Sequence, residues 1–237
     1  MKPTQTEEHI WKTLYAFIKN EHGVAGLMGN LYAESCMNPQ NLQQSFEKKL
    51  GMNDERYTKA VDLGAYKSFI SDGAGYGLAQ WTYSGRKRAL LEYAKSIGTS
   101  IGDLDMQLEF LMNELSKYSE VMDVLRTCKT VEEASEVVML KYEMPADQSE
   151  QARVKRKIYG ERYLDAFQKT LVKVTGESVW VRSGDGTDYP TIVLAKEGVT
   201  FEYAGASLDG KWYAIRTELP DKRISWISSK YSKLTRG

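Results

Sequence analysis

The sequence predicts an α+β protein of two domains, an α-rich domain followed by a small all-β domain. Up to about residue 168, apolar residues recur at the three- and four-residue spacing of amphipathic helices. From residue 174, short alternating runs are separated by glycine and aspartate turns, as in a small antiparallel sheet. A length of 237 residues is enough for one or two domains. We therefore place the first domain at 1–168, a linker at 169–173 and the second domain at 174–237.

Six helices are predicted in the first domain. Apolar residues three and four apart predict helices at about 10–18, 24–31, 84–97 and 104–115. Thr130 and Glu133 form a capping box before the fifth helix, and the segment 149–168 is the sixth. Residues 36–83, between the second and third helices, form a long polar stretch. A structureless loop of that length in a compact domain is usually functional.

Five short alternating segments predict the strands of the second domain. They read SVWVRS, PTIVLA, TFEYAG, KWYAIRT and ISWISS. Three of the five tryptophans lie in this part of the chain. Because a domain of ~65 residues buries only a modest core, some of its aromatic residues are expected to stabilise it.

Composition and charge exclude several classes of function. Lysine and arginine number 32, as do aspartate and glutamate, so the net charge is zero and general attraction to nucleic acid or an anionic membrane is not expected. No apolar run approaches the ~20 residues of a membrane span. Two cysteines, Cys36 and Cys128, and two histidines, His9 and His22, offer neither a disulfide framework nor a metal-ligand pattern. We predict no metal and no cofactor, so the chemistry must use carboxylates, hydroxyls and amides.

The N-terminal segment, MKPTQTEEHIWK, is polar and lacks the apolar core of a secretory signal. We therefore expect synthesis in the cytoplasm without a signal peptide. Separately, we expect the protein to be a monomer.

Glu34 is the most informative single residue. It follows Leu31 by three positions and Leu27 by seven, so it continues the apolar stripe of the second helix. It also lies in the last turn, just before the Asn38–Pro39 break. Burial and the negative end of the helix dipole both disfavour a charged carboxylate, so we expect a raised pKa for Glu34. A general acid in glycosidic cleavage needs that property. The alternative is a glutamate that turns to the surface at a frayed helix end.

A second informative stretch is SDGAGYGLAQWTYSGRK, residues 71–87. Its glycines permit sharp turns and close approach of the backbone to a ligand. Tyr76 and Trp81 beside the amide of Gln80 suit sugar rings, which have apolar faces and hydroxyl rims. The alternative is an ordinary glycine-rich hairpin with aromatic residues in the core. The glycines do not form GxGxxG after a strand, so nucleotide binding is not supported.

These stretches together resemble the phage tail-type lysozyme family, relatives of goose-type lysozymes and lytic transglycosylases. The resemblance rests on GVAGLMGNLYAESCMNP, AGYGLAQWTYSGRKRALLEYA and KYEMPADQS, in that order, and covers about residues 5–168. It implies a lysozyme-like α-rich fold that cleaves β-1,4 links in peptidoglycan. Glu34 matches the catalytic acid of the family. The residues that match its substrate-cleft and late signatures are Tyr76, Gln80, Trp81, Tyr142 and Glu143. Thr82 stands where some relatives have another aspartate, and its hydroxyl can hold water but cannot act as a base at neutral pH.

The last segment resembles bacterial SH3-like (SH3b) domains over about residues 174–234, which implies a small barrel that binds cell-wall peptides, often the cross-bridge. Candidates for its binding surface are Tyr189, Tyr203, Trp212, Tyr213 and Trp226, of which at least half are expected in the core. A catalytic head joined to such a module resembles a phage endolysin acting on a Gram-positive wall, and a prophage-derived autolysin is the alternative. Such a protein would be made in the host cytoplasm and act at the bacterial cell wall, and its partners would be peptidoglycan glycan strands and cross-bridge peptides.

The identity of the second carboxylate determines the type of reaction. Hydrolysis normally needs one to position or activate water. Asp72 is the nearest match to an aspartate of the goose-type relatives, and we expect it to act as base in an inverting muramidase. Without an effective base, a sugar hydroxyl could attack and give a 1,6-anhydro product, as in a lytic transglycosylase.

Other readings stay open from the sequence. The enzyme could be a glucosaminidase on the same polymer, or the chain could be a non-catalytic wall-binding or tail-structural protein. A peptidase lacks a convincing cysteine–histidine pair, because His9 and His22 both precede Cys36.

Overall fold

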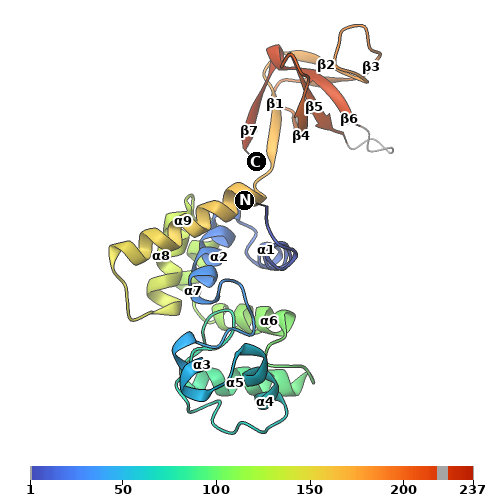
Figure 1. Ribbon diagram of the computed structural model, residues 1–237. Coiled ribbons are helices and arrows are strands. Elements are labelled where there is room, and N and C mark those ends of the chain that lie inside the picture. Colours follow the sequence, from blue (N-terminus) through green and yellow to red (C-terminus); the bar gives the residue numbers. More distant parts are fainter. Residues whose placement is uncertain (1, 218–223, 237) are drawn as a thin grey trace. The chain divides into compact units, whose positions relative to one another are not determined.

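We describe a computed structural model of the chain, covering residues 2–217 and 224–236. The chain divides into two compact units, Met1–Ala166 and Phe167–Gly237, which we describe separately. The first is helical and the second is a sheet (Figure 1). The predicted α+β layout of two domains is confirmed.

The helices of the first unit follow the predicted order, with additions. Their bounds are α1 Gln5–Ile18, α2 Glu21–Ser35, α3 Gln44–Leu50, α4 Asp54–Asp62, α5 Ser84–Ser96, α6 Leu104–Leu115, α7 Ser119–Thr127, α8 Val131–Val138, the π-helix η1 Met139–Glu143 and α9 Glu150–Phe167. The capping box predicted at Thr130 and Glu133 is present at the start of α8. No helix within the described residues is long and apolar enough to cross a membrane.

The stretch 36–83 is not the structureless loop that the sequence suggested. It contains α3 and α4, seven and nine residues long. Helix α3 buries none of its residues, so it lacks the apolar stripe on which a helix prediction depends. Helix α4 buries only Tyr57, Thr58 and Val61, a stripe too short to stand out in a polar stretch. The sequence analysis also missed α7 and η1.

Helix α2 is the central element of the first unit. Nearly all of its residues from Gly23 to Leu31 are buried, so it is surrounded by other elements rather than exposed on one face. Figure 1 shows α1, α7, α8 and α9 gathered around it, and α3, α4 and α5 gathered at the other end of this unit, with α6 between them. Glu34, in the last turn of α2, is thus carried by the best-packed helix.

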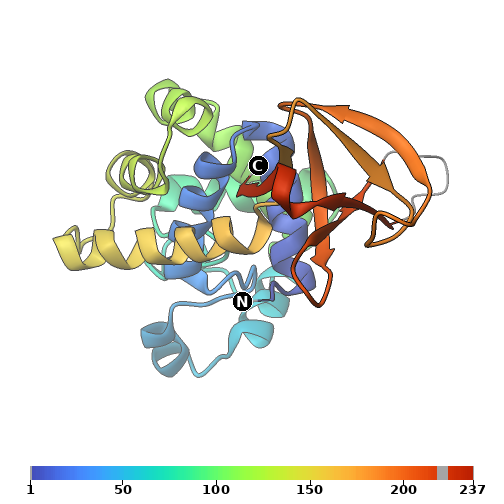
Figure 2. The same ribbon diagram turned by 90° about the horizontal axis from the view of Figure 1, so that it is seen from above.

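Two glycines of α2 let neighbouring helices come close. A Cβ added at Gly26 would lie 2.5 Å from the Cβ of Ala134 on α8, and one at Gly29 would lie 2.4 Å from the carbonyl oxygen of Arg156 on α9. Any side chain at these positions would clash, so hydrogen is required there. As a result, α9 runs directly beside α2, as Figure 2 also shows.

The second unit is an antiparallel sheet with strand order β3-β2-β6-β5-β4-β1-β7. Its strands are β1 Thr170–Val174, β2 Ser178–Arg182, β3 Thr191–Lys196, β4 Thr200–Ala206, β5 Trp212–Arg216, β6 Ile224–Ser228 and β7 Ser232–Arg236. Strands β2 to β6 match the five predicted segments. Its core is made of small aliphatic side chains: Val172, Val174, Val179, Val181, Ala195, Ile215 and Ile227.

The prediction of a linker at 169–173 is corrected, because most of these residues form strand β1. This strand pairs with both β4 and β7, and Val172 lies in the core. The change from helix to strand therefore occurs within a few residues of Phe167.

Candidate active site

Glu34 lies in the last turn of α2, as the sequence predicted. Its side chain is 18% exposed, so it is neither sealed in the core nor free in solvent. The helix ends immediately afterwards, because Cys36 and Met37 both adopt the left-handed conformation, with φ of 51° and 64°. The chain therefore leaves α2 abruptly, which keeps Glu34 at an exposed helix end.

Arg156 is the ion-pair partner of Glu34. Its Nη2 donates to Oε1 of Glu34 at 2.6 Å, from the neighbouring helix α9. The two residues are 122 positions apart in the chain, and the close contact of α9 with Gly29 brings the backbone of Arg156 beside α2. This guanidinium was not predicted from the sequence, where its only signal was the basic character of the segment 149–168. The proton predicted on Glu34 stays a prediction.

Glu143 is a second carboxylate of this site, at the end of the π-helix η1. Its Oε1 is buried and has no hydrogen-bond partner among the described residues. Burial raises the pKa of Glu143 to about 8, and the negative charge of Glu34 adds to the rise. Arg86 and Arg156 act in the opposite direction. Glu143 is therefore a carboxyl that keeps its proton near neutral pH.

Glu114 forms the centre of an adjoining buried cluster. Arg86 binds it through two bonds, Nε to Oε1 at 2.9 Å and Nη2 to Oε2 at 2.7 Å. Oε2 also accepts from Nε1 of Trp81 and the hydroxyl of Tyr142, each at 2.7 Å. Burial alone would raise the pKa of Glu114, but the arginine and these two donors lower it. The shared bonds to Glu114 thus bring Trp81 and Tyr142 together.

Asp72 does not have the surroundings of a general base. Its Oδ1 accepts from Nζ of Lys87 at 2.6 Å and from the backbone N–H of Ala74 at 2.9 Å. Its Oδ2 accepts from the hydroxyls of Tyr57 at 2.6 Å and Tyr66 at 3.2 Å. The side chain is 5% exposed and that of Lys87 is fully buried. The predicted base is corrected on this ground, because four donors occupy the oxygens that would have to bind water.

The predicted cleft residues are also largely internal. Tyr76, Trp81 and Tyr142 are fully buried, so none of them offers a ring face to a sugar. Gln80 donates from Nε2 to two acceptors of Asn41, its carbonyl at 3.0 Å and its side-chain oxygen at 2.9 Å. It therefore ties the turn at 76–81 to the chain that follows α2. Among the predicted cleft residues, Thr82 is exposed.

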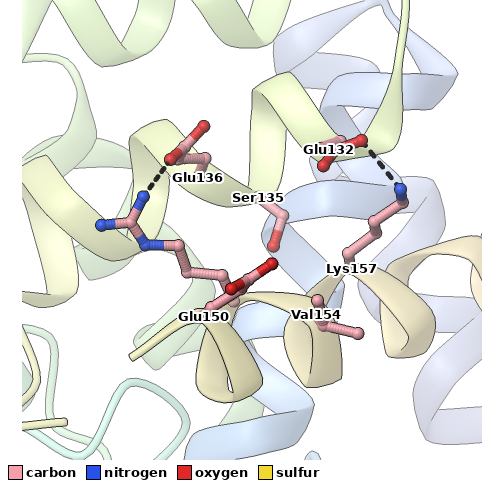
Figure 3. Close-up of a pocket in the computed structure, with 7 residues that line it drawn as sticks. Glu132, Ser135, Glu136, Glu150, Val154 and Lys157 are labelled. Atoms are coloured by element: carbon pink, nitrogen blue, oxygen red, sulfur yellow. Dashed lines mark hydrogen bonds and ion pairs between the residues drawn. The ribbon is translucent and has the colours of Figure 1, made fainter. Parts of the chain in front are cut away.

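A separate cavity of about 450 Å³ lies between α8 and α9. Figure 3 shows two ion pairs across it, Glu136 with Arg153 and Glu132 with Lys157. Ser135 in its lining accepts from Nδ2 of Asn30, one turn before Glu34 on α2. Glu34, Arg156 and Glu143 are not part of this lining, so we do not place the reaction in this cavity.

The aromatic residues predicted to bind cell walls divide into two groups. Tyr203 and Tyr213 pack against the core of the second unit, and Trp212 and Trp226 are half-buried. Tyr189 is 49% exposed. Trp180, which the sequence analysis did not select, is 47% exposed on β2. The alternation of SVWVRS was the available signal, because it places Trp180 opposite the buried Val179 and Val181.

The site therefore offers two carboxylates, one guanidinium and a neighbouring saturated cluster. Among the described residues, no group of three or more histidine, cysteine, aspartate and glutamate side chains could hold a metal ion. What the arrangement can supply is a proton, held by the buried carboxyl of Glu143, whose pKa is raised.

Comparison with known proteins identifies the family. The family model described as phage tail lysozyme matches residues 5–167, which cover the whole helical unit except its first residues. No curated protein matches the chain. The matched range includes Glu34, Arg156 and Glu143, and it supports a peptidoglycan-lysing, lysozyme-like function. The chain belongs to the phage tail lysozyme family.

Proposed function

We propose that the helical unit cleaves the β-1,4 link between N-acetylmuramic acid and N-acetylglucosamine, with Glu34 as the proton donor. The observation that carries this proposal is the position of Glu34, partly exposed at the end of the central helix and in contact with a single cation. In the reaction, the carboxyl proton moves to the bridging oxygen as the bond from that oxygen to the anomeric carbon breaks. The oxygen of water then bonds to the anomeric carbon, and its released proton restores the carboxyl.

A lytic transglycosylase is the second candidate, and the contacts of Asp72 favour it. Because four donors occupy this aspartate, it is not available to activate water. In a transglycosylase the sugar's own hydroxyl attacks the anomeric carbon, and no water is consumed. The product then ends in a 1,6-anhydro ring.

Mass spectrometry of purified walls digested with the whole chain tests the proposal. Muramic acid reducing ends support a muramidase, and anhydro ends support a transglycosylase. Glucosamine reducing ends would identify a glucosaminidase instead. Intact glycan together with retained wall binding would contradict the enzymatic proposal and favour a wall-binding or structural protein.

We further propose that the second unit is an SH3b-like module that binds the cross-bridge peptides of a Gram-positive wall. Its exposed aromatic residues support this, Trp180 and Tyr189 above all. Such a module raises the concentration of the enzyme on an insoluble polymer without changing the chemical step.

The module can be tested with one substitution. Trp180→Ala is expected to weaken sedimentation with whole cells about tenfold or more, because exposed tryptophans are common binding hot spots. The matched control is Leu208→Ala, which removes another exposed apolar side chain from the same unit. Equal binding by both variants would remove Trp180 from the binding surface.

A further inference from the structure

Two polar atoms at the Glu34 site are buried without a partner. They are Oε1 of Glu143 and Nε of Arg156, and neither has a hydrogen bond within the described residues. Leaving such a group unpaired destabilises the fold, because the group has lost its contact with water and gained no partner. One is a carboxyl oxygen and the other an N–H donor, and the charge of Arg156 acts on Glu143.

The charges at the site are not balanced. Four charged side chains affect the pKa of Glu143. They are Glu34 on α2, Arg156 on α9, Arg86 on α5 and Glu114 on α6. Arg86 and Glu114 neutralise each other through their two-fold bond. This leaves one guanidinium, that of Arg156, for the two carboxylates Glu34 and Glu143. If both were ionised, one negative charge would stay uncompensated in a partly buried place, which is costly.

We propose that Glu34 and Glu143 hold one proton between them, and that Arg156 pairs with whichever of the two is ionised. Glu143 is thus a positioning residue that acts through Glu34. This inference rests on the proposed function, in which Glu34 is the proton donor.

The structure corresponds to one of the two arrangements. Arg156 binds Glu34, which is the ionised partner, and Glu143 carries the proton. In the other arrangement Glu143 has released its proton and Glu34 has taken one up, so the negative charge has moved to Glu143. The guanidinium follows that charge, and Nε or Nη2 of Arg156 binds Glu143. Glu34 is then ready to protonate the bridging oxygen.

The backbone around Glu143 supports this role. It is the last residue of a π-helix, a rare element that is frequent at functional sites. Met144 follows in the left-handed conformation, with φ of 47°. Two uncommon conformations in succession therefore hold Glu143 in place, which indicates that its position is constrained.

The pH profile of wall cleavage by Glu143→Gln tests the inference. Without the negative charge of Glu143, Arg156 stays on Glu34, which then loses its proton at lower pH. We expect the alkaline limb of kcat/KM to move by about one pH unit or more toward acid, with a loss of about tenfold or more above that limb. Glu143→Asp keeps the carboxyl and is expected to restore much of the alkaline limb.

The matched control is Glu120→Gln, which removes an exposed carboxylate that binds Lys141 on the same π-helix. It should leave the profile unchanged. If the alkaline limb of kcat/KM in Glu143→Gln lies at the same pH as in the wild type, the inference is overturned. This holds whether the activity of the variant is normal or uniformly low. Thermal melts of both variants confirm that the compared proteins are folded.

A measurement without substrate separates this inference from the proposed function. In protein with ¹³C-labelled glutamate side chains, NMR should show two coupled carboxyl titrations in the wild type, one of them well above the usual glutamate range. In Glu143→Gln that high titration should vanish. If walls stay intact but the coupled titrations are present, the proposed function fails and proton sharing stands. If walls are cleaved and every glutamate titrates normally, proton sharing fails alone.

Discussion

Two carboxylates of the helical unit each form an ion pair of the same length, but their other surroundings differ greatly. Glu34 binds Arg156 at 2.6 Å, and Asp72 binds Lys87 at 2.6 Å. Asp72 accepts three further hydrogen bonds and its side chain is 5% exposed. Glu34 has an ion pair with one residue and 18% exposure.

The difference separates a carboxylate that stabilises the fold from one that is able to react. A carboxylate has about four acceptor positions, and Asp72 uses all of them within the protein. It cannot take a proton or bind water without breaking buried bonds. Glu34 binds a single cation and is partly exposed, so in the proposed reaction its carboxyl is free to donate a proton to a substrate oxygen. An ion pair alone therefore does not distinguish a structural acid from a reactive one. The number of hydrogen-bond acceptor positions that the protein leaves unoccupied does distinguish them.

The largest effect is expected for Glu34→Gln. The amide cannot donate a proton to the bridging oxygen, so wall cleavage should fall by about two to four orders of magnitude. The fold should be retained, since the side chain keeps its size and lies partly in solvent. Turbidity loss of purified walls measures the rate, and circular dichroism measures the melt. Glu92→Gln, a change at an exposed position of α5, is the control. Cleavage at near-normal rate by Glu34→Gln would remove the acid role.

The same change of acid to amide at Asp72 should act on stability instead. Asp72→Asn leaves the buried ammonium of Lys87 without a counter-charge, and breaking a buried pair costs about 3–5 kcal/mol. Urea denaturation measures this loss, and Asp123→Asn on α7 is the exposed control. The folded fraction of Asp72→Asn should cleave walls nearly normally. A loss of about two to four orders of magnitude in its rate would return Asp72 to the role of base.

A smaller effect is expected on the pH dependence of stability. It concerns Glu143, and it should sharpen the contrast between the Glu34 site and the surroundings of Asp72. The pKa of Glu143 is raised from 4.5 to about 8 in the fold, so the native state binds its proton more tightly than the unfolded chain does. The stability that this proton contributes is complete below pH 4.5 and is lost as the pH rises through about 8. The Glu143→Gln variant has no proton to lose at this position, so its stability should not fall for this reason as the pH rises. Relative to the variant, the wild type should therefore melt at progressively lower temperature across that range.

Parallel thermal melts of the two proteins from pH 4 to pH 9 measure this difference. A constant gap between their melting temperatures over the whole range would contradict the assignment of a proton to Glu143.

The position of Glu34 was predictable because it depends on local signals. The apolar spacing of α2 and the break at Asn38–Pro39 fix both its face and its place in the last turn. The same kind of signal predicted α5, α6 and the strands β2 to β6. Helix α3 was missed because it buries none of its residues, and α4 because its buried stripe spans little more than one turn. The π-helix η1 was missed because a π-turn has no periodic pattern of its own.

The partners of Glu34 could not be predicted, because they depend on contacts between distant segments. Arg156 reaches it only because α9 lies against Gly29. Similarly, Tyr76 and Trp81 beside glycines have the same sequence pattern in a sugar cleft and in a core. Only the packed structure shows that Trp81 donates to Glu114. Asp72 was misassigned for the same reason, since Lys87 follows it by 15 residues without any local signal of an ion pair.

Gly29 has a consequence for how this enzyme can change during evolution. The missing side chain sets the spacing between two helices, and the backbone it touches is that of Arg156 itself. Adding even one methyl group there would displace the residue that binds Glu34, although Gly29 lies more than a turn away from it. Under the role that we propose for Glu34, selection for tight helix contact in the interior and selection for acid strength at the surface thus act on the same atom-sized gap.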